Sequence, residues 1–216
     1  MAKNKEIRNV AIVGTGVIGA SWATYYLSRG FNVVATDPAP NAEANLRKYV
    51  DAAWTTLSKN GMAPSASRDR LTFEPKMAQA LAKADFVQEN GPERPDFKTK
   101  LFAEIDDATP PDSILASSSS GITMDVIQSA CKRPERCVIG HPFNPPHVIP
   151  LVEVVGGAKT SPQTIEKFCR GERDRDGTPK QSRERWSLTF ALNDIENTTR
   201  RFVYEYDNFN NDQRRG

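Results

Sequence analysis

Short apolar runs, separated by segments of helix length, characterise the first 167 residues. The runs predict strands at residues 9–14, 32–37, 86–89, 113–117, 137–140 and 151–155. Helical patterns occupy residues 20–29, about 41–60, 95–108 and 123–130 between them. Because a single helical crossover joins two buried strands in parallel, this alternation predicts an α/β fold with a doubly wound, mostly parallel sheet.

The pattern changes near Lys167. From Phe168 onward 19 of 49 residues are charged, against 37 of 167 before it, and no apolar period is sustained. Only residues 186–192 alternate well enough to predict a strand. We therefore expect one domain over 1–167, followed by an atypical charged tail over 168–216 that is largely irregular or disordered. A shifted reading frame, a retained intron or a misjoined gene model would produce such an abrupt onset.

The composition argues against a nucleic-acid-binding, membrane or secreted protein. The net charge of +2 gives no electrostatic case for nucleic acid or an anionic membrane. No apolar run approaches the roughly 20 residues that span a bilayer, and the polar start lacks a secretory apolar region. Three cysteines without zinc spacing predict reduced, structural thiols and no metal site. We expect an intracellular, cytoplasmic protein.

A glycine-rich turn, Gly14-x-Gly16-x-x-Gly19, lies between the first predicted strand and the first predicted helix. In this context Gly14 allows the tight turn, Gly16 lets backbone approach a pyrophosphate, and Gly19 lets the helix pack closely. The free N–H groups of the helix start, at Val17 and Ile18, would face the phosphates. The motif therefore predicts a Rossmann-type dinucleotide site.

Asp37 ends the second predicted strand, 18 residues after Gly19. A carboxylate there accepts hydrogen bonds from ribose hydroxyls and repels a 2′-phosphate. No arginine follows until Arg47, so NAD is favoured over NADP. The alternative is a glycine turn that only packs, with a surface aspartate beside it.

Three further polar features follow or interrupt predicted strands: the serines 117–120, His141 and Glu153. Ligands of open α/β sheets gather beyond the carboxyl ends of the strands. A buried carboxylate needs a partner, and a His141–Glu153 pair would form a general base for a hydroxyl proton. Each feature also has a structural interpretation, as a polar turn, a hydrogen-bonded loop histidine and a charge at the sheet edge.

The glycine motif, the serine run, His141-Pro-Phe-Asn144-Pro and Pro150-Leu-Val-Glu153-Val together resemble the NAD-binding domain of the 3-hydroxyacyl-CoA dehydrogenase family. The resemblance covers about residues 8–167. It implies that His141 takes the proton from a 3-hydroxyl group while hydride passes to NAD, and that Glu153 orients His141. Ser120 and Asn144 would contact the substrate.

The same resemblance places Glu93 and Lys98 on the cofactor side of the site. The sequences of these motifs resemble the carnitine 3-dehydrogenase and gulonate 3-dehydrogenase (lambda-crystallin-like) branches of the family more than the fatty-acyl enzymes. Carnitine, gulonate and 3-hydroxyacyl-CoA compounds are therefore the small-molecule substrates to consider.

The family continues with an all-α domain that closes the substrate cleft and usually forms a homodimer, and residues 168–216 do not resemble it. Two interpretations follow. The chain is an NAD-dependent oxidoreductase acting on a 3-hydroxy substrate, or it is a truncated, non-catalytic NAD-binding or crystallin-like structural protein.

Overall fold

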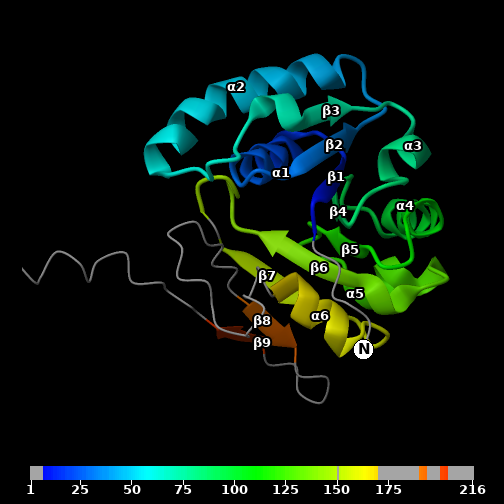
Figure 1. Cartoon of the computed structure of the whole chain (residues 1–216). Coiled ribbons are helices and arrows are strands. Elements are labelled where there is room, and N and C mark those ends of the chain that lie inside the picture. Colours follow the sequence, from blue (N-terminus) through cyan, green and yellow to red (C-terminus); the bar gives the residue numbers. More distant parts are fainter. Residues whose placement is uncertain (1–6, 150, 170–189, 194–199, 204–216) are drawn as a thin grey trace, which may run out of the picture.

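The computed structural model describes residues 7–149, 151–169, 190–193 and 200–203. The strands of its main sheet are β1 (Asn9–Val13), β2 (Asn32–Thr36), β3 (Leu71–Phe73), β4 (Phe86–Glu89), β5 (Ile114–Ser117), β6 (Cys137–Pro142) and β7 (Val152–Val155). They lie in the order β3-β2-β1-β4-β5-β6-β7, and each neighbouring pair is parallel except β6 and β7 (Figure 1). The predicted Rossmann-type, mostly parallel sheet is confirmed.

Helices cover both faces of this sheet (Figure 1). They are α1 (Val17–Ser28), α2 (Ala42–Asn60), α3 (Met77–Leu81), α4 (Pro95–Ala108), α5 (Met124–Ile127) and α6 (Pro162–Cys169). The helix predicted over 20–29 begins at Val17, because residues of the glycine motif themselves form its first turn. The helix predicted over 123–130 is divided into α5 and a short 3₁₀ turn, Gln128–Ala130.

Successive residues of a strand point to opposite faces, and β1 uses both faces for the core. Val10 and Ile12 pack with residues of α1, whereas Ala11 and Val13 pack with residues of α3, α4 and α5. Both faces of the central strands are covered, so these strands are apolar without alternation. This explains why the sequence shows continuous apolar runs.

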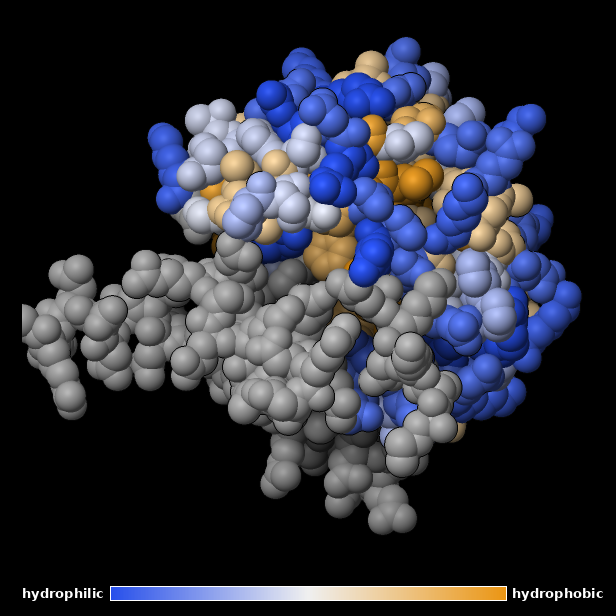
Figure 2. Space-filling model, in the orientation of Figure 1, coloured by the Kyte–Doolittle hydropathy of each residue, from blue (hydrophilic) through white to orange (hydrophobic). Residues whose placement is uncertain are grey.

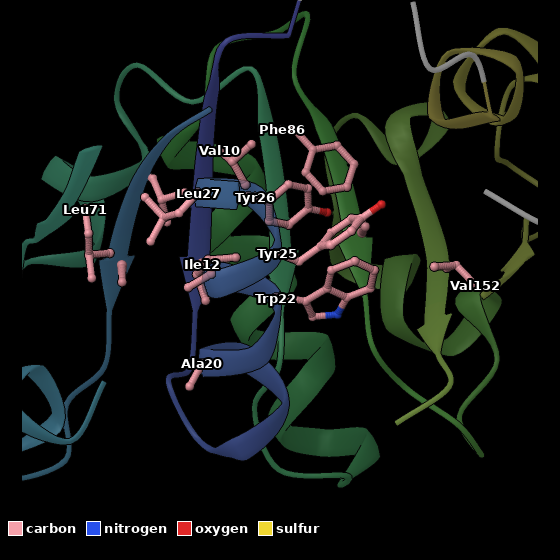
Figure 3. Packing of buried hydrophobic residues seen from close by; sticks show 14 of the residues in the cluster. Val10, Ile12, Ala20, Trp22, Tyr25, Tyr26, Leu27, Leu71, Phe86 and Val152 are labelled. Carbon is pink, nitrogen blue, oxygen red and sulfur yellow. The ribbon is translucent and has the colours of Figure 1, made fainter. Parts of the chain in front are cut away.

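Helix α1 is the most enclosed helix of the fold, because every residue from Gly19 to Ser28 is buried. Figure 3 shows its aromatic side chains beside the sheet, with Tyr26 next to Phe86; their ring centroids are 6.0 Å apart. Trp22 stacks on Tyr26 at 5.4 Å between ring centroids. This packing fixes the start of α1, where the glycine turn lies, against the edge of the sheet.

Strand β7 is antiparallel to β6, and the described residues between Pro142 and Val152 contain no helix that would return the chain across the sheet. The register places His141 directly opposite Glu153. The change of strand direction is therefore what brings these two predicted site residues together.

Residues near the predicted boundary at Lys167 belong to a helix. Helix α6 runs to Cys169, and Phe168 is buried against Phe86 with ring centroids 5.5 Å apart. Farther along, β8 (Phe190–Asn193) and β9 (Arg200–Val203) form a separate antiparallel pair. Strand β8 overlaps the strand predicted over 186–192, whereas β9 and the end of α6 lie in the part of the tail predicted to be irregular. Residues 170–189, 194–199 and 204–216 of the predicted tail lie outside the described residues.

The described surface is mostly hydrophilic on the face shown in Figure 2, with small separate hydrophobic areas. Among the helices of the described residues, none has the length and apolar character needed to cross a bilayer. The described part of the chain also contains no group of three or more His, Cys, Asp or Glu side chains placed to hold a metal ion.

Candidate active site

The carboxyl ends of the central strands meet at one edge of the sheet. The strand registers align Val13, Glu89, Ser117 and Ile139 in one row across β1, β4, β5 and β6. The glycine turn, the segment with Glu93, the serine run and His141 all follow this row. The predicted site residues therefore gather at the edge where ligands of such sheets bind.

The three glycines of the turn have different reasons to lack a side chain. Gly14 has a φ of 86°, and its N–H donates to the Thr36 carbonyl at 2.9 Å. A Cβ on Gly19 would lie 1.9 Å from the carbonyl oxygen of Gly14. A Cβ on Gly16 would meet nothing within 4 Å. Gly14 and Gly19 are required by the protein itself, whereas Gly16 leaves open space that fits the close approach of a cofactor phosphate.

The start of α1 is suited to an anion. Gly16 is the N-cap residue, no side chain caps the helix, and the first turn contains no acidic residue. The N–H groups of Val17 and Ile18 are thus available to a ligand, and the helix dipole adds partial positive charge. Val17 is 72% exposed, so the predicted phosphate position is accessible. These features fit the pyrophosphate of NAD.

Asp37 follows β2 and is tied to the glycine turn. Its Oδ2 accepts hydrogen bonds from the Thr15 N–H at 2.6 Å and the Thr15 hydroxyl at 3.1 Å, and its Oδ1 accepts from the Ala39 N–H at 2.8 Å. The carboxylate therefore lies beside the glycine turn and stabilises it, a role that the sequence pattern does not indicate. Arg47 contacts Glu43 at 2.8 Å within α2, so its guanidinium is already paired.

The four serines at the end of β5 and directly after it have four different environments. Ser117 donates to Glu89 at 2.6 Å, Ser118 donates to Asn90 at 2.7 Å, and Ser119 donates to Glu93 at 2.6 Å. The hydroxyl of Ser118 also accepts hydrogen bonds from two donors, Trp22 Nε1 at 3.2 Å and Gln88 Nε2 at 2.8 Å. Ser120 is exposed, and its hydroxyl makes no hydrogen bond to the described residues. Of the run, Ser120 is the serine whose hydroxyl is open to a ligand.

Glu93 organises the turn that carries Ser120. One carboxylate oxygen, Oε1, accepts from the Ser119 hydroxyl, from the Ser120 N–H at 3.0 Å and from the Gly121 N–H at 2.9 Å. Burial alone would raise the pKa of Glu93, but these hydrogen bonds and the charge of Lys98 outweigh it and hold that pKa below its ordinary value of 4.5. Glu93 is therefore an ionised residue at the predicted cofactor side.

Lys98 lies beneath this turn in a buried ion pair. Its ammonium group is 2.8 and 2.9 Å from the two carboxylate oxygens of Glu89, 3.1 Å from the Gly91 carbonyl and 3.7 Å from Glu93. The side chains of Lys98 and Glu89 are 1% and 0% exposed. Glu89 is absent from the residues predicted by sequence, although the reason given for Glu153, that a carboxylate in a buried strand needs a partner, holds for Glu89 as well.

His141 and Glu153 form the predicted pair. Nδ1 of His141 is 3.2 Å from Oε2 of Glu153, with His141 half-buried and Glu153 almost fully buried. In the tautomer with Nδ1–H, His141 donates a hydrogen bond to the Glu153 carboxylate and the ring lone pair lies on Nε2. Nε2 makes no hydrogen bond to the described residues and is the nitrogen available to a substrate hydroxyl. Asn144 follows on the exposed loop after β6.

The hydrogen bonds and ion pairs of the described residues divide the site residues into three groups. Asp37 contacts the glycine turn, Glu93 contacts both the Ser120 turn and Lys98, and Glu153 contacts His141. All groups lie at the carboxyl ends of the strands, with the glycine turn after β1 and the imidazole of His141 in β6. The arrangement can bind a dinucleotide and remove a proton from a compound held beside it.

The sequence is similar to that of known dehydrogenases. A family model described as 3-hydroxyacyl-CoA dehydrogenase, NAD binding domain, matches residues 9–179. L-Carnitine dehydrogenases of Bacillus cereus and Streptomyces coelicolor are 53% and 51% identical over 165 residues. Each alignment covers 76% of this chain but only 50% and 52% of those proteins. The chain thus spans about half the length of these curated relatives.

Solved structures give the same result. A 3-hydroxybutyryl-CoA dehydrogenase from Escherichia coli has a TM-score of 0.72 at 28% identity, covering 87% of this chain and 39% of that chain. An NAD⁺-dependent 5-formyl-3-hydroxy-2-methylpyridine 4-carboxylic acid 5-dehydrogenase has a TM-score of 0.69 at 39% identity, covering 76% and 53%. The cofactor in the family's description is NAD, as the glycine turn and Asp37 predict. This chain therefore belongs to the family of 3-hydroxyacyl-CoA dehydrogenase NAD-binding domains.

Proposed function

We propose that this chain is an NAD-dependent oxidoreductase that converts a secondary 3-hydroxyl group to the 3-keto group. The observation that supports this most strongly is the His141–Glu153 pair, 3.2 Å apart, on the same sheet edge as the glycine turn. The free Nε2 of His141 and the open hydroxyl of Ser120 are what a proton-abstracting site requires.

NAD, when bound, supplies the acceptor for the hydride that leaves C3. The residues that would hold it are Gly14, Gly16 and the first turn of α1 for the pyrophosphate, and Asp37 for the ribose. Glu93 and Lys98 would border the cofactor where β4 and β5 end.

His141 takes the hydroxyl proton on Nε2 as C3 is oxidised. Glu153 keeps the imidazole in the tautomer with Nδ1–H and stabilises the imidazolium that forms. Ser120 donates a hydrogen bond to the reacting oxygen, and Asn144 contacts the remainder of the substrate. Proton and hydride leave separately, so the alcohol loses two electrons and two hydrogens.

We propose L-carnitine as the first substrate to test, because the L-carnitine dehydrogenases are about half identical to this chain over 165 residues. Gulonate and 3-hydroxybutyryl-CoA follow, since both carry a hydroxyl at the equivalent carbon. A homodimer is usual in the family but is not expected from residues 168–216, which do not resemble the family's α-domain, and the cytoplasmic location stays a prediction of the sequence.

A second candidate is a non-catalytic NAD-binding or structural protein, because the glycine turn and Asp37 fit NAD without any contribution from the His141–Glu153 pair.

The test is NADH formation from the three substrates with the wild-type chain, His141→Ala and Glu153→Gln. We expect turnover with at least one substrate, a decrease of about 10²- to 10⁴-fold in His141→Ala and a smaller decrease in Glu153→Gln. NAD affinity, measured by calorimetry, should be unchanged in both variants. Absence of turnover on all three substrates, with NAD binding intact, would establish the second candidate.

A further inference from the structure

A buried serine of α1 holds the loop that follows β6. The hydroxyl of Ser21, which is fully buried, lies 2.6 Å from Nδ1 of His147 and accepts the His147 backbone N–H at 3.2 Å. The Ser21 hydroxyl has no other acceptor among the described residues, so we assign its proton to the bond with Nδ1, which makes His147 a neutral imidazole with its own proton on Nε2. Burial lowers the pKa of His147, which favours the same neutral form.

This contact differs from those of the other serine and threonine hydroxyls of the helix. Thr24 donates to the Ala20 carbonyl at 2.7 Å and Ser28 donates to the Tyr25 carbonyl at 2.6 Å, both within α1. Such local bonds are the usual arrangement for a buried helical hydroxyl. Ser21 instead bonds to a residue 126 positions away in the sequence. It joins the helix that begins at the cofactor turn to the segment that begins at His141.

The loop after β6 contacts the helices through His147 and is exposed on either side of that residue. Phe143, Val148 and Ile149 are 40%, 45% and 39% exposed, and Asn144 is also exposed. The His147 ring packs edge-on against Tyr49 of α2, with ring centroids 5.9 Å apart. Pro146 beside it is buried. The attachment of this exposed loop to α1 and α2 is thus centred on His147.

The loop is also compact, so a change at His147 is transmitted to Asn144. The N–H groups of Val148 and Ile149 both donate to the Pro145 carbonyl at 2.9 Å. Pro145 is covalently bonded to Asn144, and the turn therefore links the fastened residue to the substrate contact within three positions.

We propose that Ser21 and His147 are positioning residues, which fix the loop carrying Asn144 at a set place relative to the cofactor helix. The inference rests on the proposed function for its effect on substrate, but the contact itself exists independently of activity. Loss of the contact leaves the glycine turn and the His141–Glu153 pair intact. We therefore expect substrate affinity to change and NAD affinity to stay the same.

The kinetic test compares Ser21→Ala with the matched control Ser28→Ala, which removes a buried hydroxyl of the same helix without touching the loop. We expect the KM for the substrate to rise about five- to tenfold in Ser21→Ala and in His147→Ala, with kcat less affected. The double variant should be no worse than either single variant. His147→Asn should recover part of the loss, because its side-chain oxygen can accept the Ser21 proton.

A second readout needs no turnover. Nitrogen NMR of the histidine rings should show His147 at neutral pH with Nδ1 as an acceptor and the proton on Nε2. Amide exchange of Val148 and Ile149 should accelerate in Ser21→Ala and not in Ser28→Ala.

Equal KM and equal exchange in Ser21→Ala and Ser28→Ala would overturn the inference, as would a His147 proton on Nδ1. If the wild-type chain oxidises none of the substrates, the proposed function fails, and the NMR and exchange results still decide whether Ser21 fastens the loop.

Discussion

Substitutions of Gly16 and Gly19 separate cofactor binding from folding, because alanine should weaken NAD binding at Gly16 and lower the stability of the fold at Gly19. At Gly19 a Cβ would lie 1.9 Å from the Gly14 carbonyl oxygen, and at Gly16 it would meet nothing within 4 Å. The two variants Gly16→Ala and Gly19→Ala add the same methyl group only three residues apart.

The cost at Gly19 follows from the clash. The atom that the methyl group meets belongs to the backbone, so no rotamer change relieves the clash, and α1 or the turn must move by roughly 1 Å, at a cost of about 1–3 kcal/mol. Alanine has a helix propensity about 1 kcal/mol better than glycine, which offsets part of this cost. We expect a net loss of up to about 2 kcal/mol in the free energy of unfolding, and a melting temperature lower by about 4–8 °C.

The balance at Gly16 is different. Its φ of −59° suits any L-residue, and the loss of glycine as N-cap is roughly balanced by the reduced entropy of the unfolded chain. Stability should change by no more than about 0.5 kcal/mol. A methyl group in front of the α1 N–H groups would displace one or two phosphate hydrogen bonds, which corresponds to about 10- to 100-fold weaker NAD binding.

Urea unfolding and calorimetric NAD titration of both variants measure these effects. Unchanged NAD affinity in a folded Gly16→Ala chain would refute the placement of the pyrophosphate. A Gly19→Ala chain as stable as the wild type would show that the close packing of α1 on the turn is wrong.

Three further predictions concern the carboxylates around the site. Glu89→Gln leaves the Lys98 cation buried without its main counter-charge and should lower the free energy of unfolding by about 3–5 kcal/mol. The control Arg94→Ala, which breaks the exposed Arg94–Asp96 pair, should leave the free energy of unfolding nearly unchanged. The pKa of Glu93 is lowered in the folded chain, so its stabilisation of the Ser120 turn is complete above pH 4.5, the ordinary pKa, and is lost as the pH falls through the lowered pKa. Amide exchange at Ser120, corrected for its intrinsic pH dependence, should show this loss in the wild type. Glu93→Gln should show no such loss. Asp37→Ala removes the acceptor of both Thr15 hydrogen bonds and the ribose contact, so NAD affinity should fall by about tenfold or more, and an unchanged calorimetric titration would contradict the role of Asp37.

The predictable part of the fold is the part that continuous apolar runs define. Strands β1, β2, β4, β5, β6 and β7 were predicted because burial on both faces requires such runs. Strand β3 was missed because its three residues, Leu71–Phe73, are too few to show a pattern. The direction of β7 depends on the length of the loop before it, which does not appear in the pattern of the strand itself.

The site was predictable where a motif lies within a short stretch of sequence, as for Gly14, Gly16 and Gly19. The His141–Glu153 pair was predictable from the cost of a buried carboxylate. The partners of individual serines were not, because they are set by side chains of other strands. The Ser21–His147 contact joins residues 126 positions apart, and neither residue type indicates the other.

Isotope transfer from L-carnitine deuterated at C3, followed by mass spectrometry of the NADH that forms, observes the proposed hydride step itself. We expect one deuterium in each reduced cofactor for the wild-type chain, and a rate about 10²- to 10⁴-fold lower for His141→Ala at unchanged NAD affinity. Reduced cofactor without deuterium, or a His141→Ala rate equal to that of the wild type, would rule out direct hydride transfer from C3 with His141 as the base.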